Sequence, residues 1–371
     1  MDTVKVEDRG HMTNSSQGIK ALKTSSTLSC YLIGASSLAI QCGQILIDAG
    51  YTILGVKSQD PKVIEWAVQR GLYWTDDLEI FEAKLKEVPF DYLFSIFNKF
   101  ILPERMVNMP RQLAINCHDA PLPRYAGTNA TSWAILNNET YHGISWHIIA
   151  GKVDAGDILQ QAIFSLNTNE TALSLNFKCY DYARIEFEKL VDKLLNNTLE
   201  RSVQDLSERT FFKFDKKPSS NAFIDWNATA EEIATLHRAL DFGEYPNPLA
   251  LPKFIFGESV IIPKQVTILS LSTEPPGTII QIDAQSIEVA TNSRNILLKE
   301  CIDLTGRVIN LHDFATIWNI HAGDLLASLT AIHRQAIDET TSQYARYETL
   351  WVKDFTQIIA SASEPFVDQN K

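Results

Sequence analysis

Short apolar runs alternate with longer amphipathic segments along the N-terminal half of the chain. The apolar runs are 28–34 (LSCYLIG), 51–56 (YTILGV), 90–97 (FDYLFSIF) and 113–117 (LAINC). Between them, 37–49 and 61–70 carry apolar residues three or four positions apart, and a glycine follows each segment. A continuous apolar run is typical of a buried strand, whereas the wider spacing is typical of a helix with one buried face. The alternation therefore predicts an α/β fold with a doubly wound, mostly parallel sheet.

The C-terminal part of the chain has a different pattern. Strands are still predicted at 143–149 and 158–164 and a long helix within 170–196, but a polar stretch, 215–221 (DKKPSSN), then indicates a linker. Thr229 and Glu232 have the spacing of a capping box, which predicts a helix that ends near Leu240. Six short apolar pieces separated by turn residues follow at 251–256, 259–262, 265–269, 277–283, 286–291 and 295–299. They predict a small β-barrel, followed by a helical region after Gly306.

These patterns divide the chain into five segments. The expected segments are a tag and disordered leader at 1–27, an α/β domain at 28–214, a linker at 215–221, an OB-like barrel domain at 222–305, and a helical tail or linker to a following domain at 306–371. The leader is excluded from the fold because Asp8–Met12 resembles the scar of an expression vector.

Charge and composition narrow the range of functions. The 371 residues carry a formal net charge of −12 at pH 7, which disfavours general binding of nucleic acid phosphates. No apolar run approaches the roughly 18 residues that cross a bilayer, so no membrane association is expected. The five cysteines show no C-x-x-C spacing, which argues against a metal site or a disulfide framework and favours a reduced, cytoplasmic protein.

The glycine after the first predicted strand does not indicate a dinucleotide site. In Gly34–Ala39 (GASSLA) a serine stands where the second glycine of the G-x-G-x-x-G motif would let the backbone approach a pyrophosphate. The segment is therefore interpreted as a tight turn between a strand and a helix.

A polar cluster at the end of the 113–117 strand carries the candidate chemistry. Asn116 and His118 are two residues apart, so they face one side if the strand continues, whereas Cys117 faces away. A glycine-flanked loop, 151–157, offers two carboxylates, Asp154 and Asp157. When an amine attacks an acyl carbon, an amide donor stabilises the oxyanion, a histidine stabilises it or moves a proton, and a carboxylate orients the histidine. A structural histidine, and a hydrolase with water as the nucleophile, remain alternatives on spacing alone.

At these residues the chain resembles the folate-dependent formyltransferase family. The matching motifs are Asn116-Cys117-His118, the proline-rich loop 120–127 (APLPRYAG) and the loop 153–157 (VDAGD). The resemblance implies that Asn116, His118 and Asp154 are catalytic and that N10-formyltetrahydrofolate is the co-substrate. Ala120 and Pro121 depart from the family pattern, which has Ser and Leu there.

The same resemblance implies where the folate binds. The segment 97–103 (FNKFILP) is similar to the family's pocket-lining segment. The residues implied to bind the co-substrate are Phe97, Phe100, Ile101, Leu102, Ile149, Gly151 and Val153. The similarity continues past the linker and covers roughly 28–305.

Two features of the chain bear on which amine accepts the formyl group: a missing insertion and a short C-terminal resemblance. Methionyl-tRNA formyltransferases carry a long basic insertion after the second strand, whereas here 56–61 runs directly into the next helix. The segment 347–353 (YETLWVK) resembles the opening of a domain of nonribosomal peptide synthetases. The leading hypothesis is the N-terminal formylation domain of such a synthetase, acting on an aminoacyl group on a carrier protein. The alternatives are methionyl-tRNA, a nucleotide-linked amino sugar, or an inactive folate-binding or docking domain.

Overall fold

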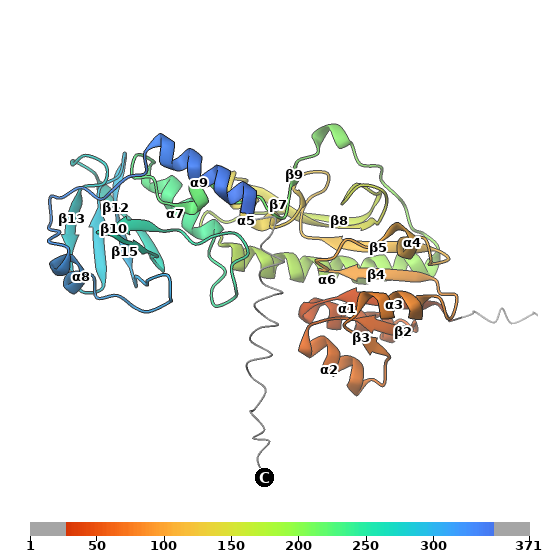
Figure 1. Ribbon diagram of the computed structural model, residues 1–371. Helices are drawn as coiled ribbons and strands as arrows, with labels where there is room; N and C mark the ends of the chain where they lie inside the picture. Colours follow the sequence, from red (N-terminus) through yellow and green to blue (C-terminus); the bar gives the residue numbers. More distant parts are fainter. Residues whose placement is uncertain (1–26, 345–371) are drawn as a thin grey trace, which may run out of the picture.

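A seven-stranded sheet forms the centre of the N-terminal domain in the computed structural model, which describes residues 27–344 (Figure 1). In spatial order the strands are β3 (Trp74–Thr75), β2 (Thr52–Lys57), β1 (Ser29–Gly34), β4 (Tyr92–Ile96), β5 (Leu113–His118), β7 (Tyr141–Ile148) and β8 (Ile158–Ser165). The pairs from β3 to β5 are parallel, and the last two pairs are antiparallel. The predicted fold class, a mostly parallel α/β sheet, is confirmed.

Helices cover the two faces of this sheet unequally. One face packs against α1 (Ser36–Asp48), α2 (Pro61–Gln69) and the long α6 (Ala172–Asn196), and the other packs against α3 (Leu78–Leu85) and α4 (Glu104–Val107). Successive residues of β5 alternate between the faces, because Ile115 and Cys117 lie in the α6 core whereas Ala114 lies in the α3 and α4 core. Asn116 and His118 therefore face the side opposite α6, as the strand pattern predicts.

The direction of winding reverses between β1 and β4. From β1 the chain moves outward to β2 and β3, and then returns to β4 on the other side of β1. Ligands of open α/β sheets bind in the crevice at such a switch point. The two strands approach closely there, since a Cβ added to Gly34 would lie 2.6 Å from the carbonyl oxygen of Ile96. The loop implied to bind folate begins at the next residue, Phe97.

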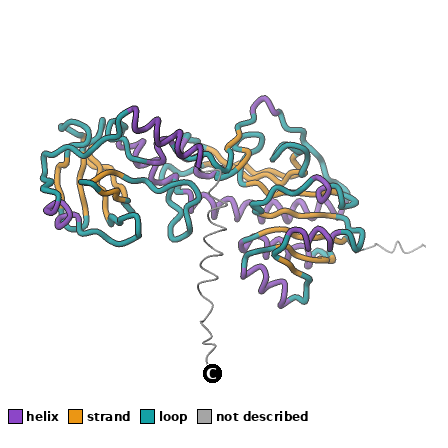
Figure 2. Tube along the Cα trace, viewed as in Figure 1, coloured by secondary structure: helices purple, strands orange, loops and turns teal. Residues whose placement is uncertain are grey.

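The linker crosses from the N-terminal domain to a second domain that contains antiparallel sheets (Figure 2). Before the linker, η1 (Leu206–Glu208) forms a 3-10 turn and β9 (Phe211–Phe212) pairs with β6 (Ala126–Gly127) of the proline-rich loop. A second 3-10 turn, η2 (Ser219–Ala222), lies at the end of the linker. Two helices, α5 (Ala130–Leu136) and α7 (Ala230–Ala239), pack together where the domains meet. The predicted capping box is present, because Thr229 Oγ1 accepts from Glu232 N and the Glu232 carboxylate accepts from Thr229 N.

The second domain has a core around the fully buried Trp226. Its four-stranded sheet has the order β12 (Gln265–Leu271), β15 (Arg294–Lys299), β14 (Ser286–Val289) and β13 (Ile279–Ile282), and a hairpin joins β10 (Phe254–Phe256) to β11 (Ser259–Ile261). Leu311 of α8 (Leu311–Ile317) and Leu326 also lie in this core, beyond the expected boundary at 305. Within residues 27–344, none of the helices combines the length and apolar character that a membrane span requires.

The last described helix, α9 (Ala331–Tyr344), returns to the linker (Figure 1). Asp338 accepts a hydrogen bond from Ser220 N at 2.6 Å, and Arg334 forms an ion pair with Asp225 at 2.9 Å. Residues 1–26 of the expected leader and the 347–353 segment lie outside the described residues.

Candidate active site

Two antiparallel strands present the polar side chains of the candidate site on one face. Asn116 on β5 is paired with His147 on β7, and His118 is paired with Ser145. Trp146, which alternates with these β7 residues, is buried in the core against α6. Loops, rather than a helix, cover the polar face of this pair of strands. The sheet therefore holds the backbone of Asn116, His118 and His147 rigidly and leaves their side chains to meet loop residues.

The loop between β7 and β8 folds back over this face and brings Asp154 to the histidines. Asp154 Oδ2 lies 3.8 Å from His118 Nδ1, and its Oδ1 lies 3.4 Å from His147 Nε2. Gly127 N donates a hydrogen bond of 2.9 Å to Asp154 Oδ2. Asp154 itself has a left-handed backbone with φ 53°, a conformation that Asp adopts more readily than most residues. The structure thus brings together the three residues implied to be catalytic. Asp154 lies next to His118, and Asn116 is connected to Asp154 through His147, which lies close to both.

The proline-rich loop is fixed from beneath by Ser145. The Ser145 hydroxyl donates to Ala120 O at 2.8 Å and accepts from Leu122 N at 3.1 Å. The Leu122–Pro123 peptide bond is cis. Strand pairing with β9 holds the far end of the loop, where Gly127 has φ 101° and a Cβ would lie 2.0 Å from Phe212 O. Only glycine fits this position, which carries the N–H that binds Asp154.

Hydrogen bonding and neighbouring charges favour the charged form of His118. Its Nε2–H donates to the carbonyl of Tyr125 at 2.8 Å, so its Nδ1 faces Asp119 at 3.7 Å and Asp154 at 3.8 Å. Burial alone lowers the pKa of His118, but the two carboxylates and the Tyr125 carbonyl outweigh it, and the pKa is raised. Burial raises the pKa of Asp154, but the charge of His118 and the Gly127 N–H oppose this, and the pKa lies well below its ordinary value.

The arrangement has the parts that acyl transfer to an amine requires. The Asn116 carboxamide and the Nδ1–H of a charged His118 are hydrogen-bond donors for an oxyanion. Asp154 stabilises the imidazolium and is itself a proton acceptor close to the same site. No serine or cysteine nucleophile is needed, and Cys117 points into the core, where burial raises its pKa well above the ordinary value.

Two loops bear the residues that are implied to bind folate. Leu102 and Ile149 lie in one core cluster, which brings the 97–103 and 149–157 loops together. Phe100, Ile101 and Val153 are exposed apolar side chains on these loops, and Gly151 has φ 48°. The carboxamide of Asn98 braces the first loop by bonding to both N and O of Phe100, at 3.1 and 2.8 Å. Exposed apolar side chains and a braced backbone suit a flat heteroaromatic ring, so the residues fit a pterin.

Comparison with known proteins identifies the family. Residues 77–189 match the formyl transferase family, and residues 217–318 match the formyl transferase C-terminal domain. The chain belongs to the folate-dependent formyltransferase family. A methionyl-tRNA formyltransferase of Alkaliphilus oremlandii is 28% identical over 312 residues, which cover 79% of this chain and 98% of that protein. The bifunctional polymyxin resistance protein ArnA of Wigglesworthia glossinidia brevipalpis is 31% identical over 228 residues, 61% of this chain and 33% of that protein.

Solved formyltransferase structures share the fold. The N-formyltransferase of Helicobacter canadensis, solved with folinic acid and dTDP-3-aminofucose, has a TM-score of 0.60 at 21% identity and covers 74% of this chain and 99% of that one. HypX of Aquifex aeolicus, solved with tetrahydrofolic acid, has a TM-score of 0.57 at 13% identity. The match covers 81% of this chain and 50% of the HypX chain. The family matches show that the protein is a folate-dependent formyltransferase.

Three residues at this formyltransferase site are absent from the sequence-based interpretation. They are His147, Gln204 and Arg209. Gln204 donates to the carbonyls of Asp154 and Gly156 at 3.0 and 2.6 Å, and Arg209 donates to the carbonyl of Val153 at 2.9 Å. Strand alternation in 143–149 is the signal that could have found His147. No local pattern marks Gln204 or Arg209, because both act on carbonyl groups some 50 positions away.

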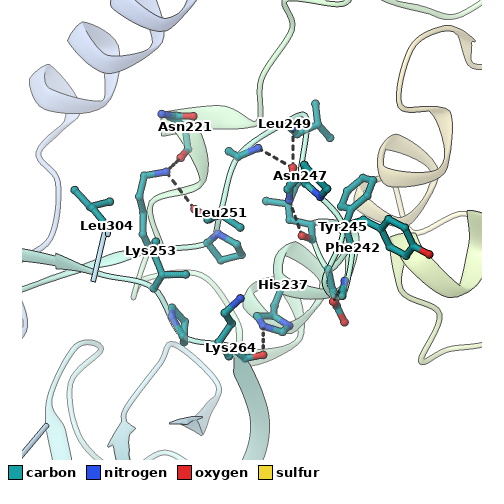
Figure 3. A pocket seen from close by; sticks show the side chains of 18 of the residues that line it. Asn221, His237, Phe242, Tyr245, Asn247, Leu249, Leu251, Lys253, Lys264 and Leu304 are labelled. Atoms are coloured by element: carbon teal, nitrogen blue, oxygen red, sulfur yellow. Dashed lines mark hydrogen bonds between the residues drawn. The ribbon is translucent and has the colours of Figure 1, made fainter. Parts of the chain in front are cut away.

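The formyltransferase also has a wide cavity away from these residues (Figure 3). Its volume is about 1170 Å³, and α7, the 240–253 loop, the linker and the second domain line it. The buried Lys253 donates to the carbonyls of Leu251 and Asn221, and burial lowers its pKa to about 8. None of Asn116, His118 and Asp154 lines this cavity. Lys253 there ties the linker to the second domain.

Proposed function

We propose that the formyl group is transferred to an aminoacyl group on the pantetheine arm of a carrier protein, at the initiation of nonribosomal peptide synthesis. The reaction class is that of the family, and the acceptor is inferred from the surface around the site. Such an acceptor presents a primary amine at the end of a flexible arm that carries a phosphate. The enzyme therefore needs a narrow catalytic centre and a cationic, partly apolar approach to it.

The connection after the second strand disfavours a tRNA acceptor. β2 ends at Lys57 and α2 begins at Pro61, so only residues 58–60 join them. No basic insertion extends from this position, and the net charge of the chain is −12. Recognition of RNA through its backbone depends on clustered Lys and Arg side chains. A single phosphate needs far fewer of them.

The observation that carries the acceptor proposal is a basic and aromatic strip beside the catalytic loop. We define this strip as residues 209–217 (RTFFKFDKK), in which four basic residues accompany one acidic residue. Phe211 and Phe214 are 42% and 52% exposed, and the Arg209 guanidinium lies 4.6 Å from the Phe211 ring. Through β9 the strip is paired with Gly127, which binds Asp154. A phosphate-bearing, partly apolar arm suits this surface.

Asn116, His118 and Asp154 are proposed to catalyse the transfer. Formyl-folate supplies an activated formyl group at N10. As the amine attacks the formyl carbon, Asn116 Nδ2–H and His118 Nδ1–H donate to the developing oxyanion. Asp154 keeps His118 charged and accepts a proton from the attacking amine. The proton is then delivered to N10 as its bond to the formyl carbon breaks, which leaves the formylated amine and tetrahydrofolate.

The test is a product assay by mass spectrometry with three acceptors. The enzyme is mixed with N10-formyltetrahydrofolate and an aminoacyl carrier protein, methionyl-tRNA or a nucleotide amino sugar. We expect a formyl mass gain on the carrier protein, formed roughly 10²–10³-fold more slowly in Asn116→Ala and His118→Ala. A gain on methionyl-tRNA or the amino sugar, with none on the carrier protein, would refute the proposed acceptor and leave the catalytic roles standing.

Charge reversal in the strip tests how the acceptor binds. In a Lys213→Glu/Lys216→Glu variant, KM for the carrier protein should rise while KM for formyl-folate stays constant, because both lysines are exposed and belong to the strip. Lys62→Glu on α2, an equally exposed lysine at the other end of the sheet, is the matched control. Equal effects of the two changes would contradict a specific role for the strip.

A further inference from the structure

His147 lies opposite Asn116 on the neighbouring strand and faces the same side of the sheet. Its side chain is almost completely buried. Nε2 lies 3.1 Å from Asn116 Nδ2 and 3.4 Å from Asp154 Oδ1, and Nδ1 lies 2.9 Å from the carbonyl oxygen of Ile148. One imidazole therefore touches a proposed oxyanion donor, a proposed proton acceptor and the backbone of its own strand.

The neighbours of the ring determine where its hydrogen lies. The Ile148 carbonyl only accepts hydrogen bonds, so Nδ1 carries a hydrogen and donates it. Nε2 then presents a lone pair and accepts one N–H of the Asn116 carboxamide. The contact with Asp154 Oδ1 at 3.4 Å is longer than an ordinary N–H···O bond, whereas 3.1 Å to Asn116 Nδ2 is within the usual range. Nε2 is therefore the acceptor of a hydrogen bond from Asn116 Nδ2.

We propose that His147 is the positioning residue for Asn116, an inference that rests on the oxyanion role proposed above for Asn116. A carboxamide nitrogen has two hydrogens in one plane. When His147 Nε2 holds one of them, rotation about the Cβ–Cγ bond stops and the second hydrogen points in a fixed direction. An oxyanion donor stabilises the transition state in proportion to this preorganisation. His147 thus acts on the reaction through Asn116 without touching the reacting atoms.

A matched pair of substitutions separates this role from a merely structural one. His147→Gln can place an amide oxygen near the position of Nε2, where it accepts from Asn116, but loses the Nδ1 position. His147→Asn can place an N–H near Nδ1, where it donates to Ile148 O, but leaves Asn116 unheld. We expect kcat to fall roughly 10–100-fold in His147→Asn, as for other residues that orient a catalytic group, with KM for formyl-folate unchanged. His147→Gln should recover much of this loss. The exposed His312→Asn is the control for the chemical change itself.

A double-mutant cycle tests whether His147 acts through Asn116. The activity assay uses N10-formyltetrahydrofolate and whichever of the three acceptors above becomes formylated. In an Asn116→Ala background, His147→Asn should cause no further loss of kcat, because the group it positions is gone. If the two losses multiply, or if His147→Gln loses as much as His147→Asn, the positioning role is overturned. Full activity of Asn116→Ala would instead refute the proposed function of Asn116, so the two failures are distinguishable.

A measurement without acceptor gives a second readout. In protein labelled with 15N at asparagine, the Asn116 side-chain resonance is assigned from its loss in Asn116→Asp. Its two amide hydrogens should exchange with solvent at different rates, since one is bonded to a buried ring. This difference should vanish in His147→Asn and persist in His147→Gln. An unchanged resonance in His147→Asn would overturn the inference whatever the acceptor is.

Discussion

Replacing Asp154 with Asn tests the electrostatic core of the proposed mechanism. The substitution keeps the size of the side chain and an oxygen that accepts from Gly127 N, but removes the charge that faces His118 Nδ1 at 3.8 Å. Two unit charges at this distance attract by about 4 kcal/mol at an effective dielectric constant of about 20. The attraction between His118 and Asp119, at 3.7 Å, is separate and remains in the variant.

The expected result follows from the direction of each contribution to the pKa of His118. In the wild-type enzyme the carboxylates raise the pKa against the effect of burial, so the ring is charged below the raised value and loses its charge as the pH rises through it. In Asp154→Asn only Asp119 remains to oppose the effect of burial on His118. The pKa of His118 therefore falls, and the ring loses its charge at a lower pH than in the wild type. At neutral pH the oxyanion then lacks one donor, and kcat should fall roughly 10²–10³-fold.

The assay combines a pH profile of kcat with NMR titration of the His118 ring. The fall of kcat on the alkaline side and the NMR midpoint should both move to lower pH in the variant. The control is Asp157→Asn, a carboxylate of the same loop for which no contact with His118 is present in the described chain. If His118 titrates at the same pH in wild type and Asp154→Asn, the electrostatic reasoning is wrong.

Three further substitutions test how the site is supported. Gln204→Leu removes the hydrogen bond to the Asp154 carbonyl, and we expect kcat to fall roughly 10-fold or more because the carboxylate is misplaced; an unchanged kcat would contradict this. Gly127→Ala places a Cβ against Phe212 O at a positive φ, so both Tm and kcat should fall, with a cost of at least about 1 kcal/mol in the free energy of unfolding measured by denaturant titration. Thr229→Ala removes the N-cap of α7 and should cost about 1 kcal/mol of stability while kcat stays constant; a loss of kcat would show that the second domain affects the chemistry.

Much of the fold follows from local patterns in the sequence. The predicted strands between β1 and β8 are mainly short apolar runs bounded by turn residues, and the capping box at Thr229 lies where its spacing placed it. The elements without a prediction are short or weakly patterned. β3 has two residues, and α5 is buried on nearly all sides, so it shows no helical alternation. Strand order, and the side of the sheet on which the linker returns, depend on contacts between distant segments and leave no local signal.

The candidate site could be predicted only in part for the same reason. The alternation of β5 placed Asn116 and His118 on one face, and the resemblance favoured Asp154 over Asp157. In the described chain, Asp154 contacts both His118 and His147. The chemistry-bearing residues thus lie in motifs, whereas the residues that hold them come from elsewhere. Gln204 bonds to a carbonyl about 50 positions away, and Phe212 pairs with Gly127 from β9, so no local pattern marks Gln204 or Phe212.

The connection between the two domains contacts the loops of the candidate active site. The segment that leads into the second domain supplies Gln204 and Arg209 to the Asp154 loop and β9 to the proline-rich loop. α9 in turn bonds to Ser220 of η2 and forms an ion pair with Asp225, which follow this segment along the chain. A displacement of residues 204–212 would therefore move the loop that carries Asp154. Because the Coulomb energy falls with distance, a displacement of Asp154 by these residues would reduce the charge on His118 without altering any proposed catalytic residue.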